Sequence, residues 1–395
     1  MIRPYVYLMV LSLAGGCSKS SNTAGKTSGP LPAARVSGVS QNRQATTSTF
    51  RFYIDLSVAS TQAVTVDYAT ADSNAKAGQD YTAVSGTLSF PAGQTELTVD
   101  VSVTGDSLRQ ANQAFFLQLS NPVNCTIGVV KATGTIVNDD GSYLPTDSAG
   151  YTTPSSYPGY TLAWSDEFSG NTLNTATWNY ETGGGGWGNA ELENYTSRSQ
   201  NIFVSNGNLI IEARQESYGG SNYTSARINS SGKQSVQYGR IDIRAKLPVS
   251  KGMWPALWML GSDYPTAGWP GCGETDIMEL IGTNPRQVVG SMHWKQADGT
   301  EGTYNNSYSL SAQDFSQQFH VFSLIWAQDS LQFLVDDQVY VNGSSQNVSS
   351  GVYPFNSPFF FIFNVAVGGD WPGPPDNTTI FPQRMFVDYV RVFQK

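Results

Sequence analysis

Short runs of alternating apolar and polar residues dominate the chain and predict β-strands. The clearest runs cover residues 238–247 and 385–393. Alternate side chains of a strand point to opposite faces, so these runs fit strands that are buried on one side. No long stretch has the periodicity of an amphipathic helix. The pattern predicts an all-β protein, and 395 residues are long enough for two domains with separate cores.

A first β domain is predicted at residues 35–140. Its strands, separated by turns rich in Gly, Asn and Asp, fall at residues 63–68, 96–103 and 114–119. The preceding segment, 18–34, is rich in Ser, Gly, Thr and Pro and predicts a flexible tether. Prolines recur through residues 141–159, which predicts a semi-rigid spacer ahead of a second domain at 160–395.

Residues 1–17 are typical of an export signal. Arg3 precedes an apolar run that ends in Ala14, Gly15, Gly16 and Cys17, and the run is too short to span a bilayer. The segment resembles a bacterial lipoprotein signal, which implies that Cys17 becomes the lipidated first residue. Ser18 resembles outer-membrane sorting, and ordinary cleaved secretion stays open as the alternative.

Charge and cysteine content exclude several classes of partner and site. A net charge of −9 disfavours nucleic acid, anionic membrane surfaces and sulfated polysaccharides. Beyond Cys17 only Cys125 and Cys272 remain, one in each predicted domain, so we expect no disulfide and no metal or redox motif. We expect Cys272 to be a packing residue. With two dispersed His residues, a zinc site or a Ser-His-Asp triad is not expected.

Three acids lie within one apolar, strand-like segment: Glu274, Asp276 and Glu279. In a regular strand Glu274 and Asp276 would share a face, and Glu279 would point to the other. A β-bulge at Ile277 and Met278 would return Glu279 to the face of the other two. We therefore predict a row of three carboxylates. The alternative is an edge strand with solvated acids that discourage aggregation.

Such a row suits glycoside hydrolysis. That reaction needs one ionised carboxylate as nucleophile and one protonated carboxylic acid to serve the departing oxygen. Asp276 between the two Glu residues would hold or share a proton with Glu274, and its charge would help keep Glu279 protonated. The three acids would titrate as a coupled unit.

Residues 160–395 resemble glycoside hydrolase family 16, and within it the laminarinase-like endo-β-1,3-glucanases. The resemblance is carried by motifs at residues 166–168, 188–196, 238–240, 251–261, 274–279, 364–371 and 388–392. It implies a concanavalin-like jelly-roll β-sandwich with an open cleft, retention of anomeric configuration and no cofactor for the chemistry. It implies Glu274 as nucleophile, Asp276 as its electrostatic assistant and Glu279 as general acid/base.

Matching positions imply further binding residues. Aromatic side chains suit the flat faces of sugar rings. The expected sugar-binding residues are Trp187, Asn189, Arg227, Trp254, Trp258, His293 and Trp371. Trp254 and Trp258 are expected to flank the cleaved bond, whereas Trp326 and His320 are expected to pack internally. The family often carries a structural calcium, for which Asp388 would supply a carboxylate and Glu167 and Gly207 carbonyl oxygens.

Residues 35–140 resemble a Calx-β domain, an immunoglobulin-like sandwich. Matching segments are 68–72, 77–81, 86–90 and 132–140. Residues 110–113 lack the acidic pair of calcium-binding members, although Asp72, Asp80 and Asp139 could contribute oxygens. We expect a spacer or adhesion role, with carbohydrate binding as the alternative.

We thus expect an all-β chain with a small immunoglobulin-like β-sandwich ahead of a C-terminal jelly roll. The expected partner is a neutral β-glucan, with membrane contact only through a lipid anchor, no nucleic acid and a monomeric state. Mixed-linkage glucan or agarose as substrate, a non-catalytic glucan-binding protein and a structural adhesin stay open.

Overall fold

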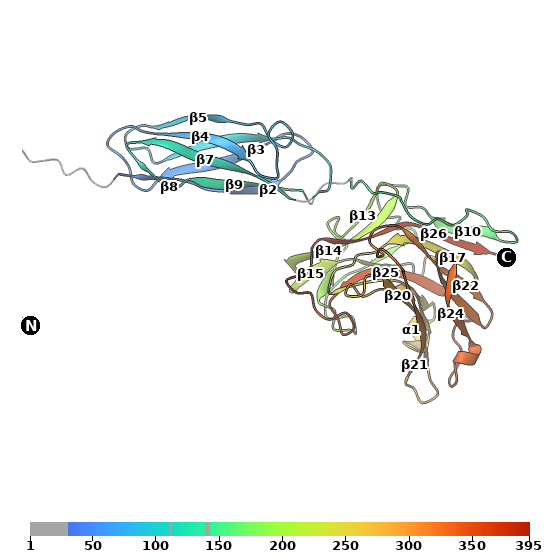
Figure 1. Ribbon diagram of the computed structural model, residues 1–395. Helices are drawn as coiled ribbons and strands as arrows, with labels where there is room; N and C mark the ends of the chain where they lie inside the picture. Colours follow the sequence, from blue (N-terminus) through green and yellow to red (C-terminus); the bar gives the residue numbers. More distant parts are fainter. Residues whose placement is uncertain (1–30, 111, 139–142) are drawn as a thin grey trace, which may run out of the picture.

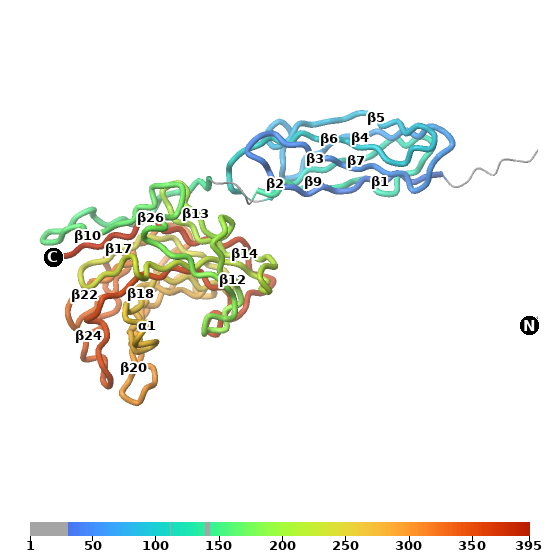
Figure 2. Tube along the Cα trace, turned by 180° about the vertical axis from the view of Figure 1, so that it is seen from behind, coloured from blue at the N-terminus to red at the C-terminus, as the bar shows by residue number. Residues whose placement is uncertain are grey.

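The computed structural model describes residues 31–110, 112–138 and 143–395. The predicted signal with Cys17, most of the tether and Asp139 lie outside these residues. Two β domains follow one another along the chain (Figure 1), and the view from behind shows the same separation (Figure 2). The predicted all-β class is confirmed. In the described ranges, the helical elements are α1 (Tyr264–Ala267) and the 3-10 turn η1 (Ser345–Asn347), and no helix could span a membrane.

The N-terminal domain is a sandwich of two sheets. One sheet has the order β6 (Glu96–Val103), β3 (Ser48–Leu56), β1 (Ala33–Val36) and β8 (Thr126–Val129). The other has the order β2 (Val39–Asn42), β9 (Lys131–Val137), β7 (Gln113–Val123), β4 (Val64–Asp72) and β5 (Ser85–Phe90). Phe50, Phe52 and Phe115 fill the core between the sheets, where Tyr81 stacks on Phe115 with ring centroids 4.4 Å apart.

The acids of the N-terminal domain are engaged by groups of the same domain. Asp80 accepts hydrogen bonds from the Arg43 guanidinium (2.8 Å) and from the Lys76 backbone N–H (2.8 Å). Asp72 accepts from the Tyr81 hydroxyl at 2.7 Å. These carboxylates therefore serve the structure of the domain, and the structure gives calcium binding here no support.

The C-terminal domain also has two sheets, which we call the inner and the outer sheet. The inner sheet has the order β11 (Asn179–Glu181), β16 (Arg227–Asn229), β25 (Phe359–Val367), β18 (Met253–Gly261), β19 (Glu274–Glu279), β20 (Gln287–Lys295) and β21 (Glu301–Ser309). The outer sheet has the order β12 (Glu193–Tyr195), β15 (Ser221–Ser225), β14 (Asn208–Tyr218), β26 (Gln383–Gln394), β17 (Gly239–Lys246), β22 (His320–Ala327), β23 (Ser330–Val335) and β24 (Gln338–Ser344). Two more strands, β10 (Thr161–Asp166) and β13 (Ile202–Ser205), pair with β26 and β14.

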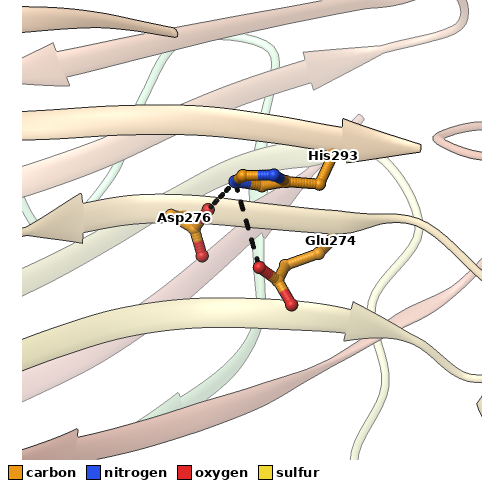
Figure 3. Close-up of side chains that lie close together, drawn as sticks. All are labelled: Glu274, Asp276 and His293. Carbon is orange, nitrogen blue, oxygen red and sulfur yellow. Dashed lines mark ion pairs between the residues drawn. The ribbon is translucent and has the colours of Figure 1, made fainter. Parts of the chain in front are cut away.

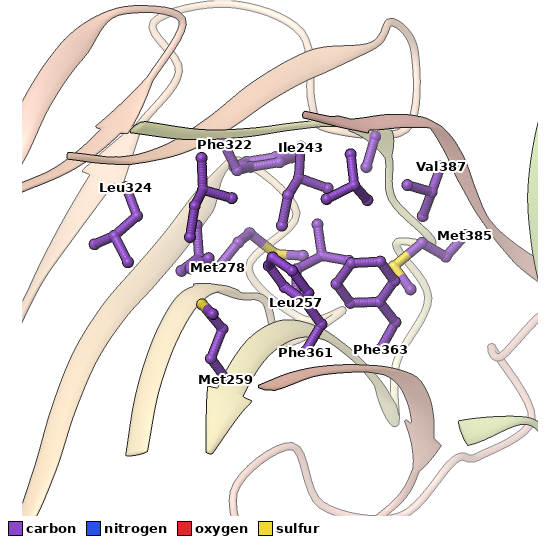
Figure 4. Close-up of a cluster of buried hydrophobic side chains, with 14 of the residues drawn as sticks. Ile243, Leu257, Met259, Met278, Phe322, Leu324, Phe361, Phe363, Met385 and Val387 are labelled. Carbon is purple, nitrogen blue, oxygen red and sulfur yellow. The ribbon is translucent and has the colours of Figure 1, made fainter. Parts of the chain in front are cut away.

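A single apolar core joins the two sheets (Figure 4). Phe361 and Phe363 of β25 meet Ile243 of β17 and Val387 of β26, and all four side chains are buried. Every residue of β25 is buried, which explains its nearly continuous apolar run. Trp326 belongs to this core, as predicted, and its indole N–H donates to the Phe355 carbonyl at 2.7 Å.

The segment between the domains is attached to the C-terminal domain. The Arg244 guanidinium of β17 donates to the carbonyls of Ser148 (2.7 Å) and Tyr151 (2.6 Å). The Tyr157 hydroxyl donates to Asp242 at 2.7 Å, and the Thr153 backbone N–H donates to the Tyr389 hydroxyl at 3.1 Å. The segment predicted as a semi-rigid spacer is thus fixed to the C-terminal domain by hydrogen bonds at Ser148, Tyr151, Thr153 and Tyr157. The polar groups of outer-sheet strands bind this segment, and the Pro content alone could not reveal them.

The two domains touch through Arg109, in the loop between β6 and β7. Its guanidinium donates to the carbonyls of Ser199 (2.9 Å) and Gln200 (3.2 Å) and lies 3.4 Å from the Glu212 carboxylate. It also lies 4.1 Å from the ring centroid of Phe203. Arg109 is 2% exposed, so its side chain is buried in the neighbouring domain.

Candidate active site

Strand β19 brings Glu274, Asp276 and Glu279 to one side of the inner sheet. Against β18, Asp276 pairs with Trp258 and Met278 pairs with Leu257, so Ile277 has no partner. The same shift separates Asp276 from Glu279 against β20. Ile277 and Met278 both enter the buried core, and all three acids line one cleft. The predicted bulge is present and has the predicted effect.

Gly273 sets the start of this strand. Its φ is +79°, and a Cβ atom there would lie 2.6 Å from the Pro354 ring. A side chain would therefore strain the backbone and displace that ring just before Glu274. Cys272, one residue earlier, is buried with Leu260 and Phe360 and is a packing residue, as predicted.

The cleft has a volume of about 970 Å³ and crosses the inner sheet from β11 to β21. Aromatic rings and acids lie together along it. The seven predicted sugar-binding residues all line it: Trp187, Asn189, Arg227, Trp254, Trp258, His293 and Trp371. The structure therefore brings together residues up to 184 positions apart in sequence, from Trp187 to Trp371. Their individual contacts with a sugar stay predictions.

The two outer acids differ in proton affinity. Burial raises the pKa of Glu274 to about 8, and the Asp276 charge adds to this, whereas His293 and Arg227 oppose it. Burial raises the pKa of Glu279 well above its usual range, and the charge of Asp276 adds to this shift. The Trp254 indole N–H donates to Glu279 at 2.9 Å. Burial thus keeps Glu279 protonated, which suits an acid, while the nearby Arg227 charge favours the ionised form of Glu274.

His293 compensates the charge of the acids (Figure 3). Its Nε2 lies 3.0 Å from Asp276 and 4.0 Å from Glu274, while its Nδ1 lies 2.5 Å from Glu301. Burial lowers the pKa of His293, but Asp276, Glu274 and Glu301 together raise it to about 10. The ring is therefore an imidazolium at neutral pH, and both nitrogens carry protons. A metal would need a ring nitrogen without a proton, so we assign no metal to this group.

Arg227 organises the side of the cleft near β11. Its guanidinium donates to Glu181 at 2.5 Å and lies 4.9 Å from the ring centroids of both Trp187 and Trp258. The charge is thus neutralised by Glu181, and the guanidinium plane holds two aromatic rings in place. Trp187 donates its indole N–H to the Gly183 carbonyl at 3.1 Å, which fixes its orientation.

A chain of hydrogen bonds supports Trp258 from behind. Its indole N–H donates to the Asn364 side-chain oxygen at 2.8 Å. The Asn364 amide donates to the Tyr195 hydroxyl at 3.1 Å, which donates to Glu191 at 2.8 Å. Asn189 donates to the other oxygen of Glu191 at 3.1 Å. The rings and amides of the cleft therefore share one buried polar network.

Several cleft residues were missed by sequence reasoning. They are Glu181, Tyr264, Trp269, Glu301, Asn305 and Asn364. Trp269 follows a Gly in a Pro- and Gly-rich loop just before the catalytic strand, which could have signalled an exposed aromatic residue. Glu301 gave no local signal, because its approach to His293 depends on the pairing of β20 with β21.

The expected calcium position is made of ion pairs. The Arg244 guanidinium donates to the Asp388 carboxylate at 2.7 Å, and Arg391 donates to both oxygens of Glu167, at 2.9 and 2.7 Å. Asp388 therefore already has a cationic partner. The oxygen expected from Glu167 is its carbonyl, which the ion pair with Arg391 does not involve. Gly207 lies in the β13–β14 turn with φ +73°. The predicted calcium rests on the family resemblance alone.

His320 packs internally, as predicted. Its Nδ1 lies 2.7 Å from the Asp336 carboxylate, and its ring contacts Phe315 with centroids 4.9 Å apart. Cys125 and Cys272 are both buried and form no disulfide, which also agrees with the prediction.

Comparison with known proteins gives two family matches. Residues 189–390 match glycosyl hydrolases family 16, and residues 39–141 match the Calx-beta domain. A beta-glucanase of Rhodothermus marinus is 42% identical over 247 residues, which cover 60% of this chain and 86% of the relative. A glucan endo-1,3-beta-glucosidase A1 of Niallia circulans is 38% identical over 274 residues, 63% of this chain and 40% of that relative.

Solved structures agree with these matches. The catalytic domain of an endo-1,3-beta-glucanase (laminarinase) from Thermotoga petrophila superposes with a TM-score of 0.57 at 46% identity. The superposition covers 60% of this chain and 98% of that domain. The similarity thus spans a complete catalytic domain of the solved relative.

Proposed function

Because the chain belongs to glycosyl hydrolases family 16, we propose that it hydrolyses internal β-1,3 linkages of glucans with retention of anomeric configuration. The observation that carries the proposal is the row of Glu274, Asp276 and Glu279 on the cleft side of a bulged strand. Relatives named as glucan endo-1,3-beta-glucosidases and laminarinases support a polysaccharide substrate and this linkage.

The reaction is a double displacement. The ionised Glu274 attacks the anomeric carbon while Glu279 gives its proton to the departing oxygen, which leaves a covalent glycosyl-enzyme. Glu279, now ionised, takes a proton from water, whose oxygen attacks the same carbon and releases Glu274. Asp276 stands between them along the strand, and its charge is compensated by His293. No cofactor takes part in any step.

The cleft suits a neutral sugar chain. Indole rings of Trp187, Trp254, Trp258 and Trp371 line it and offer apolar faces for sugar C–H groups. The amides of Asn189 and Asn305 and the Arg227 guanidinium offer hydrogen bonds to hydroxyl groups. With several acids in the cleft, an anionic polysaccharide would be repelled.

The test is product analysis with laminarin, lichenan and agarose as parallel substrates. Wild-type protein should release oligosaccharides from laminarin, and Glu274→Gln, which keeps the side-chain shape, should release none. Products from lichenan or agarose alone would keep the mechanism and replace the proposed linkage. Binding of laminarin without any product would refute hydrolysis and support a glucan-binding protein.

A second variant separates the two Glu residues by role. Glu279→Ala should lose about 10²- to 10⁴-fold in kcat on laminarin, the usual contribution of a general acid. It should keep much of the wild-type rate of the first step on an aryl glycoside, whose leaving group needs no proton. Equal losses of this step on both substrates would assign Glu279 a different role.

Export and anchoring complete the proposal. The lipoprotein-type signal supports a mature chain that begins at a lipidated Cys17 and is held at the outer membrane. We also propose that the chain acts as a monomer. Metabolic labelling with a radioactive fatty acid should mark the wild type, and Cys17→Ser should remain unlabelled. An unlabelled wild type found in the medium would support ordinary secretion instead.

A further inference from the structure

The hairpin of β20 and β21 places a fourth carboxylate behind the row of acids. Glu301 is the first residue of β21, and its carboxylate lies 2.5 Å from Nδ1 of His293. The other ring nitrogen lies 3.0 Å from Asp276. The imidazole is thus held between two carboxylates, one at the catalytic strand and one at the cleft rim. The reaction as described above does not use Glu301.

We propose that Glu301 is a positioning residue that keeps the His293 ring oriented and charged, so that the imidazolium faces Asp276 and Glu274. The inference rests on the proposed function, because it assigns the charge state of the same acids. Glu301 would act through His293 and not by contact with the reacting atoms.

The geometry supports a fixed ring. The Thr303 hydroxyl lies 3.2 Å from the same Nδ1, and it donates to Glu301 at 3.0 Å. Thr303 pairs with His293 across the β20–β21 ladder, so all three side chains are tied to one hairpin. The side chain of His293 is 17% exposed and that of Asp276 is 5% exposed. The ring is therefore shielded from water, while the Glu301 carboxylate, 38% exposed, reaches it from the cleft rim.

The charges around the ring explain why a second carboxylate is needed. Acids outnumber bases among the groups that act on His293 or its partners: Glu274, Asp276 and Glu279 on β19, Glu301 on β21, Lys295 on β20 and Arg227 on β16. Lys295 pairs with Glu301 in the ladder, but the described residues contain no ion pair between them within 4.0 Å. The imidazolium is thus the cation next to Asp276, and its loss would raise the pKa of Glu274 further.

Glu301→Gln tests the proposal, because it removes the charge and keeps the shape. The chain has two His residues, so imidazole resonances in NMR can be assigned to His293 and His320. In Glu301→Gln the titration midpoint of His293 should fall by about one pH unit or more, the equivalent of one charge-assisted hydrogen bond. His320, which is paired with Asp336, should keep its midpoint and serves as the internal reference.

Activity gives the second readout. Below the new His293 midpoint, kcat/KM of Glu301→Gln should stay near the wild-type value. Above it, kcat/KM of the variant should fall to about one tenth of the wild-type value. The reason is that lowering the midpoint by one pH unit reduces the fraction of charged His293 tenfold at high pH. Asp298→Asn is the matched control, since it removes an acid of the same hairpin that bonds to Thr300 and not to His293. It should change neither readout.

An unchanged His293 midpoint in Glu301→Gln would overturn the proposal. So would a loss of activity that is the same at every pH, because that would indicate direct contact of Glu301 with the sugar chain. The NMR titration needs no substrate. An inactive wild type would therefore refute the proposed function, while the midpoints would still decide whether Glu301 controls the ring.

Discussion

Arg109 should hold the two domains together, and Arg109→Ala should release them. In the folded protein the guanidinium donates to two carbonyl groups, lies beside Glu212 and covers the Phe203 ring. It comes from a loop that its own domain stabilises, because Asp106 in that loop pairs with Arg43. The contact exists only when both domains are folded, so its loss should lower the free energy of unfolding.

The expected loss in the free energy of unfolding depends on the groups that lose Arg109 as a partner in Arg109→Ala. Removing one partner of a buried ion pair typically costs about 3–5 kcal/mol, because the remaining charge is stranded. Here Glu212 keeps hydrogen bonds from Arg214 and Arg384, both at 2.6 Å, so no stranded charge arises. Burial, followed by the charges of Arg214 and Arg384, lowers the pKa of Arg109, which shows that its burial is itself costly. We expect a net loss of about 2 kcal/mol, the sum of a few ordinary hydrogen bonds.

Calorimetry and small-angle scattering would measure the effect. For a domain of about the size of the C-terminal one, a loss of about 2 kcal/mol in the free energy of unfolding lowers Tm by roughly 4–8 °C. The radius of gyration should rise as the domains separate. Arg51→Ala is the control, because its ion pair with Asp100 (2.8 Å) is exposed and lies within the N-terminal domain. If Arg109→Ala melts at the wild-type temperature and keeps the wild-type radius of gyration, the contact does not hold the domains.

Two further predictions concern the cleft. Deleting Ile277 removes the bulge and shortens the spacing by one residue, so a regular strand keeps Glu279 on the face of Glu274 and Asp276; the variant should keep measurable turnover, with a lower Tm from the loss of a buried side chain. Ile277→Val keeps the bulge, should cost about 1 kcal/mol and should stay active. A folded deletion variant without any turnover would show that the face of the strand alone does not place the acid. Asn364→Ala removes the acceptor of the Trp258 indole N–H, so KM for laminarin should rise about fivefold with little change in kcat, as expected for one lost hydrogen bond. Unchanged KM would show that the ring is held by packing alone.

The sequence predicted the features that depend on local pattern. The alternation of apolar and polar residues predicted strands such as β17 and β26. The spacing of Glu274, Asp276 and Glu279 predicted the bulge of β19. Tryptophans within family motifs were expected in the cleft and lie there. These predictions worked because side-chain direction in a strand follows from counting residues.

Features that depend on contacts between distant segments were not predictable in this way. Arg109 and Glu212 belong to different domains, and the register of the β20–β21 hairpin decides whether Glu301 reaches His293. The prolines of the linker predicted its stiffness but not its attachment, because its partner Arg244 lies more than ninety residues away. A charged side chain gives no local sign of its partner, so sequence reasoning underestimates ion pairs at such junctions.

The roles of the catalytic acids likewise cannot be predicted from local sequence, because they depend on residues of other strands. Glu274 and Glu279 have the same side chain, so residue type does not distinguish them, and the strand pattern only places them on one face. Burial and Asp276 raise and His293 lowers the pKa of both acids, so what separates them is the rest of their surroundings: the Arg227 charge acts on Glu274, whereas the Trp254 indole N–H bonds to Glu279. Arg227 reaches the row from β16 and Trp254 from β18, so the strand order of the inner sheet sets which acid meets which partner. Moving Arg227 or Trp254 would blur the two roles without touching the catalytic strand.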